Sequence, residues 1–178
     1  QSVNNRNGTE LDLGGVNPVE PTYQTSEINF NPAIQFSDPN STNASYIETT
    51  NGNNVSGDFT IITVFESGQL GGDTGDFENA PVLLGAGTSG TDLDYGLGIA
   101  EGRIHLNAAN NDDLTVRSTA GTTYIDFEPY IATATRVRST GALALYINSA
   151  SNATGTGSTS TFSNPSGFGI GNNPSPTV

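Results

Sequence analysis

Residues 130–148, YIATATRVRSTGALALYIN, identify the fold class of this chain. Small, β-branched and apolar residues fill two short runs on either side of Ser139-Thr140-Gly141, a sequence typical of a tight turn. In the second run Leu143, Leu145 and Ile147 fall on one face of an extended chain, because side chains alternate along a strand. The stretch therefore predicts two β-strands joined by a short turn.

Another strand is predicted at residues 58–66, DFTIITVFE. Alternation places Ile61 and Phe65 on one face, and Ile62 and Val64 on the other. Because both faces are apolar near the centre, we expect this strand to lie in the middle of its sheet.

Short alternating runs recur along the rest of the chain, and no stretch has the period of a helix. The further predicted strands are 33–36, 46–49, 82–85, 94–100, 103–107, 114–117, 122–127 and 168–171. A tight hairpin is expected at 100–102, AEG, and low-complexity loops at 67–79 and 149–165; the second could also be an edge meander. Many short strands separated by turns predict one all-β domain, either a sandwich or a barrel.

The composition excludes several classes of function. The chain has 178 residues and a formal net charge of −13, with no lysine, so binding to nucleic acid or to an anionic membrane is not expected. It has no cysteine, which rules out disulfides and thiolate metal sites, and no apolar run long enough to span a membrane. It also has no methionine, so we expect it to be processed from a longer, secreted precursor.

The order of the strand sequences resembles the concanavalin A-like, laminin-G-type domains of large secreted surface proteins from Bacteroidota-type bacteria. The resemblance covers roughly 29–173 and is carried by these segments: INFNPAIQFSDPNSTNASYIETT, GDFTIITVF, LLGAG, DYGLGIAEGRIHLN, YIATATRVRSTGALALYIN and FGIGNN. Two places depart from the pattern, since Phe36-Ser37 stands where F-D-G is usual and Asn148-Ser149 where N-G is usual.

The resemblance implies a two-sheet antiparallel jelly-roll sandwich over residues 29–178, preceded by an extended segment over residues 1–28. Such domains usually close with a further strand of the form G-x-I-A-E-I-x-x-Y, and no such strand follows residue 173. Either the sequence ends before the domain does, or another copy supplies the strand, for which residues 1–28 are a candidate.

A catalytic reading rests on residues 124–128, YIDFE. Glycoside hydrolases of family 16 share this fold and use an E-x-D-x-E strand, whose three carboxylates alternate into one cleft. Here Tyr124 replaces the first Glu, which leaves only Asp126 and Glu128 on one face, and the chain has no Trp to stack a sugar. We therefore expect no enzymatic activity.

Calcium is the cofactor that the sequence favours, because it prefers carboxylate and carbonyl oxygens in loops. The metal-ligand candidates are Asp73, Asp76, Asp92, Asp94, Asp112 and Asp113. Candidate ligand-binding residues are Tyr95, His105 and Tyr124. His105 alternates with Ile104 and Leu106, which predicts that it lies on a solvent-facing side of its strand or at the sheet edge.

The sequence thus predicts a non-catalytic, extracellular or cell-surface module for adhesion or binding. Its expected partners are a glycan or a cell-surface protein, with calcium assisting. The alternative is a structural subunit that assembles with copies of itself into a filament or surface layer by strand exchange.

Overall fold

A computed structural model of the chain describes residues 3–4, 10–15, 21–36, 45–49, 55–68, 82–86, 95–108, 116–162 and 168–171. These residues form strands and turns and contain no helix. Accordingly, no helix within these ranges has the length and apolar character needed to cross a membrane.

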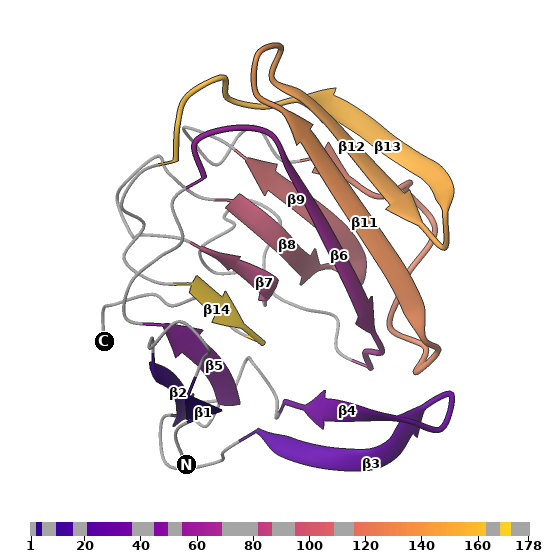
Figure 1. Cartoon of the computed structure of the whole chain (residues 1–178). Helices are drawn as coiled ribbons and strands as arrows, with labels where there is room; N and C mark the ends of the chain where they lie inside the picture. Colours follow the sequence, from indigo (N-terminus) through magenta and orange to yellow (C-terminus); the bar gives the residue numbers. More distant parts are fainter. Residues whose placement is uncertain are drawn as a thin grey trace.

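Two antiparallel sheets lie face to face, and a separate hairpin lies beside them (Figure 1). The larger sheet has the order β1 (Val3–Asn4), β2 (Glu10–Gly15), β5 (Ser45–Thr49), β14 (Phe168–Ile170), β7 (Val82–Ala86), β8 (Tyr95–Ala100), β9 (Arg103–Ala108) and β10 (Val116–Arg117). The smaller sheet has the order β13 (Ala150–Thr156), β12 (Ala142–Ile147), β11 (Tyr130–Val137) and β6 (Phe59–Phe65). The hairpin consists of β3 (Thr22–Ile28) and β4 (Asn31–Gln35).

The hydrophobic core fills the space between the two sheets. The large sheet contributes Leu97 and Leu106, and the small sheet contributes Ala134 and Leu145, all fully buried. Each of these residues is one member of an alternating pattern, so these four strands bury one face against the opposite sheet. The predicted all-β jelly-roll architecture is confirmed.

Most predicted strands are found within one or two residues of their expected bounds. The hairpin predicted at 130–148 is formed by β11 and β12, which pair from Ala132–Ile147 to Val137–Ala142. The tight turn at 100–102 is also confirmed, because Glu101 and Gly102 both have the positive φ of a two-residue hairpin.

The prediction that residues 58–66 form a central strand is wrong. Among the residues that the structure describes, β6 pairs only with β11 and therefore lies at the edge of the small sheet. The side chains of Ile62 and Val64 point away from the core and are 65% and 55% exposed. Apolar residues on both faces are typical of a central strand. Here the outer face is open to solvent, so the same pattern occurs in an edge strand.

One further segment differs from the prediction, and in a second segment the structure agrees with one of two predicted alternatives. Residues 122–127 form bends rather than a strand. The sequence predicts a loop or an edge meander over 149–165, and part of this segment is β13, the edge strand beside β12. Its Gly, Ser and Thr composition conceals the strand because none of these residues gives an apolar alternation.

The N-terminal residues take part in the larger sheet, since β2 pairs with β5 of the same chain. The expected domain boundary at residue 28 falls at the turn between β3 and β4. The division into residues 1–28 and 29–178 stays a prediction.

Candidate functional site

The predicted calcium ligands, Asp73, Asp76, Asp92, Asp94, Asp112 and Asp113, all lie outside the described residues. Within the described ranges, no group of three or more His, Asp or Glu side chains is placed so that it could hold a metal ion. Calcium binding therefore stays a prediction.

The three predicted ligand-binding residues are described, and all are buried: Tyr95 and Tyr124 belong to the hydrophobic core, and His105 does not. Tyr95 is 4% exposed and its ring stacks on Phe162 at a centroid distance of 5.7 Å; burial raises the pKa of its hydroxyl to about 12. Tyr124 is 3% exposed, meets Tyr130 edge-on at 5.0 Å, and its hydroxyl accepts a hydrogen bond from Asn152. A ligand role for these residues stays a prediction.

His105 is 3% exposed, so the expectation that it lies on a solvent-facing side or at the edge is wrong. It does point to the opposite side of β9 from Ile104 and Leu106, as alternation requires, but β9 and its neighbour β8 are buried on both faces. Its partner in the register is Gly98, and its Nε2 atom has no hydrogen-bond partner among the described residues. Burial, followed by the positive charges of Arg117 and Arg103, lowers the pKa of His105 from 6.5 to about 4.

The buried imidazole predicts a loss of stability in acid. Because the folded-state pKa of about 4 lies below the unfolded value of 6.5, the unfolded chain binds the proton first as the pH falls. We expect the His105 contribution to be complete above pH 6.5 and to decline toward pH 4, lowering the free energy of unfolding by roughly 3 kcal/mol. Urea unfolding of the wild type and of His105→Gln at several pH values measures this difference, since the carboxylates titrate in both proteins. If the free energies of unfolding of the two proteins changed with pH in parallel, the prediction would be contradicted.

Residues 124–128, the candidate catalytic segment, bend at Tyr124, Asp126 and Phe127 and contain no strand. The Asp126 carboxylate accepts hydrogen bonds from the Tyr130 hydroxyl at 2.9 Å and from the Glu128 N–H at 3.3 Å. The bond to Asp126 is the main reason why the pKa of Tyr130 is raised. Asp126 and Glu128 do not share the face of a strand, so the alternation that directs hydrolase carboxylates into one cleft is absent from this segment.

Phe127, between these two carboxylates, has a feature that the sequence does not reveal. Its φ of 58° lies in the left-handed region, which is rare for a bulky residue, and its side chain is 70% exposed. Its N–H donates to the Ser67 carbonyl, and its ring lies so close to Gly68 that a β-carbon added there would overlap with it. The backbone thus holds an apolar ring in solvent, next to two exposed acidic residues.

We call Asp126, Phe127 and Glu128 the Phe127 surface. Backbone strain that keeps a large apolar side chain exposed is characteristic of functional sites, because packing alone would not maintain it. The sequence draws attention to the carboxylates of this segment and not to the aromatic residue between them. The one available signal was an aromatic residue flanked by acidic ones, in the segment DFEP that precedes β11.

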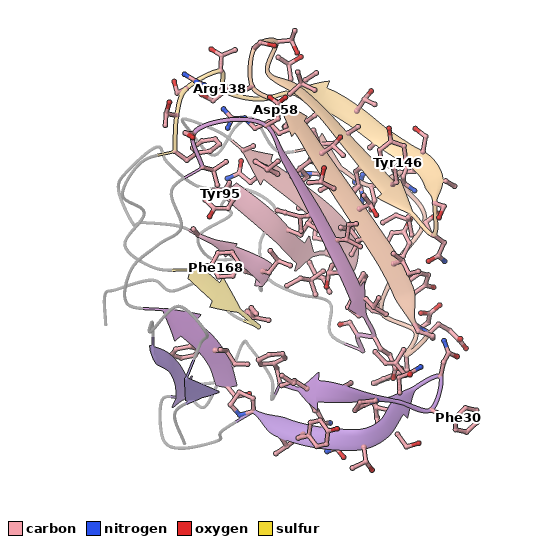
Figure 2. The ribbon with its side chains drawn as sticks, in the orientation of Figure 1. Phe30, Asp58, Tyr95, Arg138, Tyr146 and Phe168 are labelled. Carbon is pink, nitrogen blue, oxygen red and sulfur yellow. The ribbon has the colours of Figure 1, made fainter. Side chains whose placement is uncertain are left out.

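The β3–β4 hairpin is a second exposed apolar element, visible at the bottom of Figure 2 with Phe30 at its tip. Phe30 is 91% exposed, and Tyr23 and Ile34 are 67% and 50% exposed. Phe30 also has a left-handed φ, 63°, so it shares the backbone feature and the exposure of Phe127. The two sites differ in charge, because the hairpin tip has no acidic residue among its four turn positions, 28–31.

No protein-family model matches this sequence, and no curated protein does so. Several solved structures are similar to it in fold. Three of them are the botulinum neurotoxin serotype G binding domain (TM-score 0.59, 12% identity), the LG1-3 region of the laminin alpha2 chain (0.53, 12%), and the native heptameric SAP-like pentraxin from Limulus polyphemus (0.50, 14%).

The matches cover 92%, 78% and 71% of this chain, but only 38%, 22% and 57% of the respective solved chains. The chain thus spans less than two thirds of the length of each of them. At these identities the similarity concerns the fold, and it places the chain among jelly-roll sandwiches of the laminin G and pentraxin kind.

Proposed function

We propose that this chain is a non-catalytic, extracellular binding module that recognises a glycan through the Phe127 surface. The observation that carries the proposal is the exposed, strained Phe127 ring between Asp126 and Glu128. An exposed aromatic face offers an apolar platform for a sugar ring, and carboxylate oxygens accept hydrogen bonds from sugar hydroxyls.

The orientation of the acidic groups supports this function. The Tyr130 hydroxyl holds the Asp126 carboxylate through both oxygens, at 2.9 and 3.1 Å, which fixes the orientation of the acceptor that precedes Phe127 in the chain. A pre-oriented acceptor loses little freedom on binding. Because the chain carries a net charge of −13, we propose neutral or amino-bearing glycans as ligands and not sulfated ones.

The similar structures support a binding function only in general terms. One of them is a toxin's binding domain, and the others are laminin and pentraxin chains. The proposed extracellular location rests on the same similarity. Calcium assistance is part of the proposal, and adding calcium or a chelator during the binding measurement tests it separately.

A glycan array with neutral, amino and sulfated glycans, followed by titration calorimetry, tests the proposal. We expect Phe127→Ala to weaken binding of the selected glycan by about 10- to 100-fold, since aromatic residues at the centre of an interface contribute most to affinity. Phe30→Ala is the matched control, because it removes another exposed ring at the hairpin tip. Equal losses in both variants, or the absence of any glycan that binds, would contradict the proposal.

A structural role in a filament or layer is the second proposal. The observation in its favour is that β2 lies near the N-terminal end of the chain and pairs with β5, an arrangement that an exchanged strand from another copy could reproduce. Deleting residues 1–20 would remove β1 and β2, and polymers that persist in the deletion variant would rule out this form of assembly.

A further inference from the structure

Strand β6 lies at an edge of its sheet, but its sequence and geometry are those of a strand that has a neighbour on both sides. Its seven residues, FTIITVF, contain no charge and no proline, and its pairing with β11 runs from Phe59 to Phe65 without a bulge. Edge strands usually carry one of these protective features, because their unpaired N–H and C=O groups would otherwise pair with another chain. Figure 1 shows β6 at the rim of the small sheet, where the described residues provide a partner on one side only.

The hydrogen bonds that Ile131 of β11 makes with Asn148 show which main-chain groups of β6 face its open edge. Ile131 accepts a hydrogen bond from the Asn148 N–H and donates its own N–H to the Asn148 side chain, so its main-chain groups point toward β12. Directions alternate along a strand, and Ala132 therefore points toward β6, where it pairs with Thr63. The residues of β6 whose N–H and C=O groups face the open edge are thus Thr60, Ile62 and Val64.

We propose that a second copy of this chain pairs antiparallel with this edge, on a two-fold axis at Ile62. The sequence of β6 is nearly self-complementary about this residue. The axis would pair Ile62 with its own counterpart, Thr60 with Val64, Ile61 with Thr63, and Phe59 with Phe65.

This register satisfies the main-chain groups of the edge. The pairs Ile62–Ile62, Thr60–Val64 and Val64–Thr60 are all hydrogen-bonded pairs, and each exchanges two N–H···O=C bonds. Side chains keep their faces, because the paired residue numbers are both even or both odd. The two small sheets become one continuous sheet, and Ile62 and Val64 lose part of their 65% and 55% exposure.

Charge favours this edge over the rest of the surface. The chain has 18 acidic residues, yet the four strands of the small sheet contain only one charged residue, Arg136, which is buried. Two copies with a net charge of −13 each can therefore approach here with little repulsion along the strands. The exception lies at the two ends of β6, where the axis brings Asp58 of one copy near Glu66 of the other.

The first test is sedimentation equilibrium of the full chain, at concentrations from micromolar to submillimolar. We expect a reversible monomer–dimer equilibrium with micromolar affinity, since a seven-residue edge buries less than a standard interface. Ile62→Lys places two like charges on the axis and is expected to weaken the dimer at least ten-fold. The matched control is Ile131→Lys on the same sheet face but on β11, which should leave dimerisation unchanged.

A second variant tests the register through a gain of affinity. Glu66→Lys would turn both end contacts into attractions between the Asp58 carboxylate and the introduced ammonium group, so we expect it to tighten the dimer several-fold at low salt. For the wild type, added salt should tighten the dimer, because it screens the Asp58–Glu66 repulsion.

Hydrogen exchange tests the assignment of the edge residues. In the dimer the amides of Thr60, Ile62 and Val64 should gain protection with protein concentration, while those of Ile61 and Thr63, which face β11, should be protected at every concentration.

A protein that stays monomeric at all concentrations would overturn the proposal. An equal loss of dimer affinity in Ile62→Lys and Ile131→Lys would also overturn it, because it would indicate that the sheets stack face to face. Circular dichroism of each variant checks folding, and a solvent-exposed position makes misfolding unexpected. The proposal does not depend on glycan binding, since Phe127→Ala leaves β6 unchanged.

Discussion

Replacing Arg136 with methionine is expected to lower the free energy of unfolding by about 3 kcal/mol, although the two side chains have similar length. Arg136 is 1% exposed on β11 and donates to the Ser158 carbonyl at 2.7 Å and to the Ser160 carbonyl at 2.5 Å. Its guanidinium carbon lies 4.2 Å from the centre of the Phe162 ring, and burial lowers its pKa. Methionine would remove the hydrogen bonds to the buried Ser158 and the half-buried Ser160, at about 1–3 kcal/mol each, partly offset by the removal of a buried charge.

The control for this prediction has the same chemistry at the surface. Arg138 donates to the Thr159 and Ser56 carbonyls, at 3.1 and 2.9 Å, where water can take its place. We therefore expect Arg138→Met to cost about 1 kcal/mol or less. Urea unfolding, with two probes to confirm a two-state transition, measures both variants. Similar losses in the two would show that the burial of Arg136 does not produce the effect.

Phe162→Ala should have an even larger effect, a loss of about 3–5 kcal/mol. The ring is fully buried between Arg136 and Tyr95, and the backbone of Phe162 exchanges two hydrogen bonds with Val55, ahead of β6. Phe162 thus connects the segment after β13 to the segment before β6, and truncation would leave a cavity in the core. Phe30→Ala, at 91% exposure, is the matched control and is expected to change stability by less than about 0.5 kcal/mol.

The two substitutions should not be additive. Because the Arg136 guanidinium lies on the Phe162 ring, the double variant is expected to be more stable than the sum of the two single losses predicts, by about 1 kcal/mol or more. The double-mutant cycle uses the same urea measurements. Additive losses would indicate that the ring and the guanidinium are energetically independent.

Local patterns predict the strands and turns of this fold well. The β11–β12 hairpin can be predicted from the sequence for two reasons. Leu143, Leu145 and Ile147 alternate with outward-facing residues, and Gly141 supplies the positive φ of the turn. Strand β13 is harder to predict, since ASNATGT has no apolar periodicity and is stabilised by its pairing with β12. The resemblance to laminin-G-type domains supplies the architecture.

The candidate sites are much less predictable. The six aspartates expected to bind calcium lie outside the described residues, and the alternation around His105 gives its side of β9 but not its burial. Phe127 could not be identified, because its exposure depends on a left-handed backbone and on contacts with Ser67 and Gly68, some sixty residues earlier in the chain.

The amino-acid order of this protein is enough to establish an acidic, lysine-free, all-β chain with its main strands and turns, because alternation and turn chemistry are local properties. The three-dimensional arrangement establishes which faces are covered: it buries His105 and Arg136, leaves Phe127 in solvent, and puts β6 at an edge instead of in the centre. Burial depends on which distant strands come to lie side by side, and a pattern of period two is the same in a central strand and in an edge strand.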